Sequence, residues 1–275
     1  MDGFLRQPDR LRFLVCSDVD IISAGKLSEK FVPQPPYYDG IIAVGPFYQD
    51  EIEKKEDEAV ALGDIASVIA QLENIVCRVI YLPTEKDPVP MIVSQMNLTP
   101  NSIGIHGRRL NLTPELFIMG FTEKSELGQG TGPIVPENPS YEDIENVELV
   151  SGVSVGVIKE MLDKRTEDGA EEPKKGDQSD ETKNDTGIFV LNYRYAHTLN
   201  QFLFHMTDDL DQAGIDLVVI ASPTTSSELT RLPKKFGRLS IVAPKSLRRG
   251  FYSTVELARN EAGAWSTALI EHHQL

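Results

Sequence analysis

Four carboxylates follow directly after two apolar runs of the sequence. Asp18 and Asp20 come after the first run, and Glu85 and Asp87 come after the third. Reactive and ligand-binding groups of open α/β sheets gather beyond the carboxyl ends of the strands, so we expect these four side chains to converge. Carboxylates that lie close together repel one another unless a cation or protons intervene. Oxygen ligands of this kind suit Mg²⁺ or Ca²⁺ better than Zn²⁺.

The carboxylate cluster has two interpretations. In the first, Asp18, Asp20, Glu85 and Asp87 bind a metal ion. In the second, which we favour, Lys86 neutralises the cluster together with Arg194 or Lys245, and the result is an ion-pair network without a metal.

The elements that would position these residues alternate between apolar runs and a helical pattern. The short runs at 11–16, 41–44 and 76–82 are typical of buried parallel strands. Between the second and third runs, residues 57–75 carry apolar side chains at spacings of three and four, which predicts an amphipathic helix. Strand, helix and strand in this order indicate βαβ units and a parallel sheet.

The rest of the chain predicts further strands and one long insertion. Short strand-like pieces at 102–106, 108–112 and 116–121 predict antiparallel hairpins. Later strands are expected at 187–191, 215–221, 239–243 and 251–258, with 265–270 pairing with the last of them. Residues 163–186 contain no large apolar side chain, so we expect a disordered acidic insertion within one domain that spans 1–275. An acidic recognition segment is the functional alternative for this insertion.

Composition and charge exclude several classes of protein. The chain has 275 residues, 40% of them hydrophobic, which is globular usage and excludes a wholly disordered or fibrous chain. Its 27 basic and 42 acidic residues give a net charge of −15, which would repel nucleic acid and anionic membranes. A local basic cluster near the C-terminus is the exception; it contains Lys234, Lys235, Arg238, Arg248 and Arg249.

The apolar runs, the first residues and the two cysteines predict the compartment of the protein and the redox state of its thiols. No apolar run approaches the ~20 residues of a membrane span, and the first residues do not have the pattern of a signal peptide. We therefore expect a soluble, intracellular and cytoplasmic protein. Cys16 and Cys77 lie in separate apolar runs and are expected to be buried thiols instead of a disulfide.

The order of these pieces resembles the calcineurin-like metallophosphoesterase family. The resemblance spans roughly residues 11–258 and is carried by the segments LRFLVCSD, ALGDIASVIAQLENIVCRVIYLPTEKDP, LTPNSIGIHGRRLNLTPELFIMGF and IVAPKSLRRGFYSTVEL. It implies an α/β (α+β) fold, a metallophosphoesterase-type four-layer β-sandwich flanked by helices. In that family, two metal ions activate water for attack on a phosphoester.

The resemblance also implies which positions would hold the metals, and most of them are changed. Asp18 matches the family's Asp-x-His motif, but Asp20 replaces its histidine, and Pro46 stands where the bridging aspartate would be. In the Gly-Asn-His-Asp turn only Asp87 remains, because Glu85 and Lys86 replace the asparagine ligand and the catalytic histidine. The positions expected to be vestigial are Pro46, Lys86, Tyr193, Ser222, Thr224 and Lys245.

A two-metal hydrolase mechanism is therefore not expected. A dinuclear site needs a bridging anion and nitrogen ligands, and none of the five histidines falls at a ligand position of the family. We expect no catalytic residue and no cofactor, with Mg²⁺ or Mn²⁺ at the carboxylates as the alternative.

Three functions remain open on the sequence. The favoured one is a catalytically inactive metallophosphoesterase-fold protein that acts as a scaffold or interaction subunit, with protein partners and no nucleic acid. The alternative is a metal-dependent phosphoester hydrolase with a remodelled carboxylate site, in which Lys245 or Arg248 would hold the phosphate. A phosphate or nucleotide sensor that binds without cleavage lies between the two.

Overall fold

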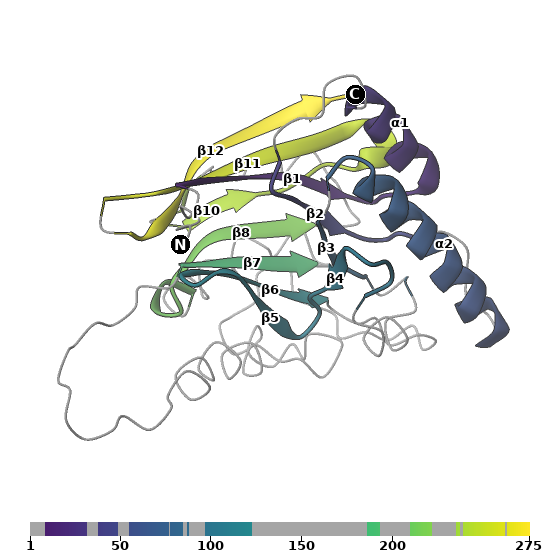
Figure 1. The fold of residues 1–275 in the computed structure, drawn as a ribbon, viewed down its shortest axis with the longest axis horizontal. Coiled ribbons are helices and arrows are strands. Elements are labelled where there is room, and N and C mark those ends of the chain that lie inside the picture. The colour runs from purple at the N-terminus through teal and green to yellow at the C-terminus, as the bar shows by residue number, and fades with distance from the viewer. Residues whose placement is uncertain are drawn as a thin grey trace, which may run out of the picture. The chain divides into compact units, whose positions relative to one another are not determined.

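The computed structural model contains two β-sheets, one in each of two compact units (Figure 1). The residues that the structure describes are 9–31, 38–48, 55–76, 78–84, 87, 97–122, 186–192, 210–221, 235–236, 239–261 and 263–275. The first unit comprises Met1–His106 and Pro244–Leu275, and the second comprises Gly107–Ala243. That the whole of 1–275 is a single domain stays a prediction.

The first unit holds a six-stranded sheet whose central strands run parallel. Its strands are β1 (Arg10–Ser17), β2 (Gly40–Val44), β3 (Val79–Leu82), β4 (Ser102–Gly104), β11 (Phe251–Arg259) and β12 (Trp265–Gln274). Their spatial order is β12-β11-β1-β2-β3-β4. The neighbours from β1 to β4 pair in parallel, whereas β11 pairs antiparallel with both β1 and β12. The carboxyl ends of β1, β2 and β3 therefore lie at the same end of the sheet.

Two helices, α1 (Ile21–Phe31) and α2 (Lys55–Glu73), pack on one face of this sheet (Figure 1). The strand residues of this core lie at every second position, and the helix residues lie at spacings of three and four. Each set therefore points from its element into the layer between the sheet and the helices. The fully buried members of this core are Leu14, Cys16, Ile41, Ala43, Val79 and Tyr81 of the strands and Ala24, Leu27, Ile65, Ile69 and Leu72 of the helices. The apolar stripe predicted for residues 57–75 is thus what holds α2 against the sheet.

The second unit holds the other six-stranded sheet. Its strands are β5 (Arg108–Thr113), β6 (Leu116–Thr122), β7 (Thr186–Asn192), β8 (Ile215–Ala221), β9 (Lys235–Phe236) and β10 (Leu239–Val242). Their order is β5-β6-β7-β8-β10-β9. The inner pairs are parallel, and the outer pairs β5–β6 and β9–β10 are antiparallel. The inner strands are almost wholly buried and are rich in apolar residues, which is typical of parallel strands.

Most of the expected strands are confirmed, but the pairing of one of them differs. The strand near residue 102 was expected in an antiparallel hairpin, whereas β4 pairs in parallel with β3. Gly107, with a φ of 63°, turns the chain from β4 into β5, which belongs to the other sheet. A turn between two short strands looks the same in sequence whether the strands pair with each other or not.

Several expectations fall partly or wholly outside the described residues. Of the predicted insertion at 163–186, only Thr186 is described, and it is the first residue of β7 instead of part of a loop. Cys16 is a fully buried free thiol whose pKa burial raises to about 12, while Cys77 lies outside the described residues. Among the helices that the structure describes, none is long and apolar enough to cross a membrane.

Candidate functional site

The carboxyl end of β1 is joined to the end of β2 by backbone hydrogen bonds. The Asp18 N–H donates to the carbonyl of Val44 at 3.0 Å, and the Val19 N–H donates to the carbonyl of Pro46 at 3.1 Å. Asp18 adopts a φ of 52°, a left-handed conformation that aspartate tolerates better than most side chains. This turn places the Asp18 carboxylate at the end of the sheet where reactive groups of α/β proteins gather.

Arg248 contacts both carboxylates that follow β1. Its Nε lies 3.2 Å from Asp18 Oδ1 and 3.5 Å from Asp20 Oδ2. The Ser246 hydroxyl donates to Asp18 Oδ2 at 2.5 Å, and the Arg248 N–H donates to the Asp18 carbonyl at 3.3 Å. The charged side chains are 21% (Arg248), 33% (Asp18) and 28% (Asp20) exposed, so water screens these pairs only in part.

Asp20 also begins helix α1. Its Oδ1 accepts a hydrogen bond from the Ser23 N–H at 2.7 Å, and the Ser23 hydroxyl accepts one from the Asp20 N–H at 3.0 Å. This reciprocal pair is a capping box, which supplies partners for two N–H groups at the helix start. Partial burial alone would raise the pKa of Asp20, but the hydrogen bonds from Ser23 and the charge of Arg248 outweigh it and lower that pKa. Asp20 is therefore ionised at neutral pH.

Asp87, which follows β3, is buried and surrounded by hydrogen-bond donors. Its Oδ1 accepts from the N–H groups of Phe47 at 2.8 Å and Tyr48 at 3.0 Å, and its Oδ2 accepts from the Thr84 N–H at 2.8 Å and the Thr84 hydroxyl at 3.2 Å. The carboxylate passes so close to Gly45 that a Cβ there would lie 2.3 Å from Oδ2. Asp87 thus links the loop after β2 to the loop after β3.

The remaining predicted site residues divide into two groups. Pro46 offers only its carbonyl, which accepts from the Val19 N–H and from Nη2 of Arg248 at 3.4 Å. The Nζ of Lys245 lies 5.0 Å from the centre of the Phe251 ring. The predicted residues that lie outside the described part of the chain are Glu85, Lys86, Tyr193, Arg194, Ser222 and Thr224.

These residues fit a guanidinium better than a metal ion. Within the described ranges, no group of three or more His, Cys, Asp or Glu side chains is placed to hold a metal. Both oxygens of Asp87 accept hydrogen bonds from the chain, and Asp18 and Asp20 share the cation of Arg248. The dinuclear centre that the resemblance implies does not fit this donor set, and we derive no chemical step through it.

Sequence reasoning did not identify Arg248 as the partner of these carboxylates. It assigned their neutralisation to Lys86 with Arg194 or Lys245, and named Arg248 as a member of the basic cluster and as a phosphate ligand. The signal that could have identified Arg248 was its place shortly after the strand expected at 239–243. In the structure it lies in the one-turn 3₁₀ helix η3 (Leu247–Arg249).

Comparison with known proteins supports the fold. No protein-family model matches the chain, and no curated protein matches it. One solved structure has 11% sequence identity and a TM-score of 0.58, and the match covers 96% of this chain and 99% of the chain in that structure. The crystal structure of TT1561 of Thermus thermophilus has 16% identity, a TM-score of 0.51 and coverage of 94% and 98%.

A third solved structure is larger than this chain. It is named "Putative 5'-Nucleotidase from Staphylococcus aureus in complex with alpha-ketoglutarate", with 11% identity and a TM-score of 0.54. The match covers 96% of this chain but 54% of the other, so this chain spans about half of that protein. The expected fold class is thus confirmed as a mixed α/β structure with two sheets and few helices, which these solved structures share, while the four-layer arrangement of the sandwich stays a prediction.

The burial of Asp87 predicts a stability effect that depends on pH. Burial raises the pKa of Asp87 to about 6, and the hydrogen bonds from Thr84, Tyr48 and Phe47 oppose that rise. Because this pKa is higher in the folded chain than the ordinary value of 3.8, Asp87 stabilises the fold most below pH 4, and that contribution is lost as the pH rises through about 6. Asp87→Asn removes this dependence.

Urea unfolding of wild type and Asp87→Asn between pH 4 and pH 8 measures the pH-dependent contribution of Asp87 to the free energy of unfolding. At pH 7 the variant should be less stable by about 1–3 kcal/mol, since an amide presents N–H groups where the carboxylate accepts hydrogen bonds. The advantage of the wild type should grow as the pH falls from 7 to 4. A difference that is constant across this range, or that shrinks toward pH 4, would contradict the assignment.

Proposed function

We propose that this chain is a catalytically inactive protein of metallophosphoesterase-type fold that serves as a scaffold or interaction subunit of a larger protein complex. The observation that carries the proposal is the position of Arg248, whose Nε lies within 3.5 Å of both Asp18 and Asp20. A fixed cation of the chain itself thus lies against the carboxylates that would otherwise bind a metal. In this proposal the chain has no catalytic residue and needs no cofactor.

Electrostatics support the proposal. Two unit charges of the same sign at 4 Å repel by about 4 kcal/mol when the effective dielectric constant is ~20. A divalent ion on Asp18 or Asp20 would meet at least this repulsion from Arg248, unless the arginine moved away. The neighbouring Pro46 has no side-chain atom that could offset this cost as a ligand.

The histidines give no independent support for a metal centre. His106 lies between β4 and β5, and His272 and His273 lie in β12. The His272 ring forms a hydrogen bond with Ser253, and the His273 ring forms one with Thr254 and lies 3.9 Å from the Glu271 carboxylate. His197 and His205 lie outside that part.

A protein partner is favoured over a nucleic acid. The net charge of −15 creates a field that repels polyphosphates, whereas a protein surface of either sign can be accommodated locally. A scaffold needs a fold that persists without a ligand, and the first unit is held by a core of fully buried residues.

The net charge of the Asp18, Asp20 and Arg248 side chains supports a second candidate function. Asp18 and Asp20 carry two negative charges against the single positive charge of Arg248, so the group retains a net negative charge. The alternative is therefore a metal-dependent phosphoester hydrolase with a remodelled carboxylate site.

A phosphodiesterase assay separates the two candidates. Wild type is incubated with bis(4-nitrophenyl) phosphate and Mn²⁺ or Mg²⁺, beside Asp18→Ala and a buffer blank. We expect no turnover of the wild type above the blank. Turnover that disappears in Asp18→Ala would establish the hydrolase and overturn the proposal.

The scaffold role has its own test. An extract of the cells that naturally produce the chain is fractionated by size exclusion, and the chain is detected with an antibody. We expect it to elute well above its own mass of 30.6 kDa, together with a fixed ratio of partner proteins. Elution of the endogenous chain at its own mass would show that it does not belong to a stable complex.

A further inference from the structure

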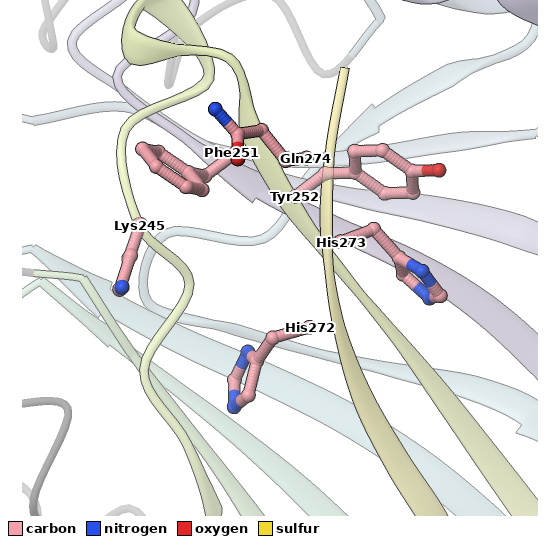
Figure 2. Close-up of a pocket in the computed structure, with 6 residues that line it drawn as sticks. All are labelled: Lys245, Phe251, Tyr252, His272, His273 and Gln274. Carbon is pink, nitrogen blue, oxygen red and sulfur yellow. The ribbon is translucent and has the colours of Figure 1, made fainter.

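A shallow hollow of about 250 Å³ lies beside β11 and β12 in the first unit, and the carboxylates of Asp18 and Asp20 do not line it. Its lining residues are Lys245, Phe251, Tyr252, His272, His273 and Gln274 (Figure 2). We propose that this hollow binds the phosphate group of a small molecule. The inference is independent of the proposed function, because binding here requires neither a metal ion nor turnover.

The charge of the lining supports an anionic ligand. Lys245 carries a positive charge, His272 gains one on protonation, and Gln274 offers an amide donor. None of the six lining residues is acidic, although the whole chain has 42 acidic residues and a net charge of −15. The carboxylate of Glu271 lies 3.9 Å from Nε2 of His273, so the positive charge available to an anion comes from Lys245 and His272.

The donors come together on one side of the strands. Phe251 lies opposite Gln274 in the β11–β12 ladder, and Ser253 lies opposite His272, so these four residues share a face. Figure 2 shows Lys245, Phe251, His272 and Gln274 on one side of β12 and the rings of Tyr252 and His273 on the other. The ammonium, imidazole and amide groups thus line the same part of the hollow.

The main chain around these donors is well anchored. The Ser17 hydroxyl donates to the carbonyls of Pro244 at 2.9 Å and Lys245 at 3.3 Å, which fixes the loop that carries Lys245. The Leu275 N–H donates to the carbonyl of Gly250 at 2.7 Å, and this bond holds the end of β12. A preorganised set of donors loses less conformational entropy when a ligand binds.

Two side chains in the hollow also have fixed orientations. The Nδ1 of His272 forms a 2.8 Å hydrogen bond with the Ser253 hydroxyl, which sets the direction of the imidazole ring. The Nζ of Lys245 lies 5.0 Å from the centre of the Phe251 ring and is attracted to its face. The lysine charge is therefore kept beside an aromatic surface at the mouth of the hollow.

Size and donor geometry point to phosphate as the chemical class. The volume is just below the ~300 Å³ lower limit of ordinary ligand pockets, which favours a small molecule. A tetrahedral anion accepts hydrogen bonds from several directions at once, and the donors here come from a loop and a strand. Lysine is a common phosphate ligand because it acts as a point charge.

Isothermal titration of the full chain with inorganic phosphate, at low ionic strength, tests the proposal. We expect saturable binding to wild type that weakens about tenfold or more in Lys245→Met. His272→Gln, which retains a group able to bond with Ser253, should also weaken binding. Lys26→Met is the matched control, because it removes the same charge from an exposed position on α1, and it should bind as wild type does.

The identity of the phosphate carrier follows from two further titrants. Phenyl phosphate that binds more tightly than inorganic phosphate indicates an organic phosphate ester whose ring lies against Phe251, whereas equal affinities indicate free phosphate. Acetate should bind much more weakly than either. The proposal is overturned if wild type binds neither phosphate compound, if acetate binds equally well, or if Lys26→Met weakens binding as much as Lys245→Met. A thermal unfolding curve for each variant confirms that it is folded.

Discussion

The ion pairs between Arg248 and the carboxylates of Asp18 and Asp20 organise the carboxyl end of the parallel sheet. They connect three parts of the chain, since Asp18 directly follows β1, Asp20 directly precedes α1 and Arg248 lies in η3, more than two hundred residues later. The backbone joins them as well, because the Arg248 N–H donates to the Asp18 carbonyl. Each carboxylate accepts a hydrogen bond, from Ser246 or from Ser23, and has Arg248 as its counter-charge, so the partly buried negative charges are compensated.

A third carboxylate, that of Asp87, has a different role at the same end of the sheet. Its oxygens accept hydrogen bonds from backbone N–H groups and from Thr84. It therefore holds the loops after β2 and β3 in place, and the close approach of Gly45 is a consequence. The carboxylates that the sequence predicts as one cluster therefore have two separate structural roles. Asp18 and Asp20 form ion pairs with Arg248, whereas Asp87 links two loops through hydrogen bonds.

Much of the fold was predictable from the sequence, because strands and helices leave local periodic signals. The runs that became β1, β2 and β3 are continuous and apolar because both faces of a central parallel strand are covered, and the stripe of α2 follows from its contact with the sheet. The parallel pairing of β4 was not predictable, since a three-residue strand has too few side chains to show which neighbour it joins.

The candidate site was predictable only in part. The positions of Asp18 and Asp20 followed from their place after an apolar run, and the structure brings these two together. Their contact with Arg248 depends on a fold that joins distant segments, and no local pattern records it. The direction of the Asp87 carboxylate depends on the conformation of two loops, which residue types alone do not specify.

In the proposed function, Arg248 takes the place of a metal ion beside Asp18 and Asp20. Calorimetric titration of chelator-treated protein with Mn²⁺ and Mg²⁺ tests it most directly, with wild type, Asp18→Ala and Arg248→Met compared. We expect no heat of binding from wild type or Asp18→Ala, and weak binding in Arg248→Met, where the two carboxylates lose their counter-charge. Tight binding by wild type that is lost in Asp18→Ala would show that these carboxylates hold a metal ion despite Arg248.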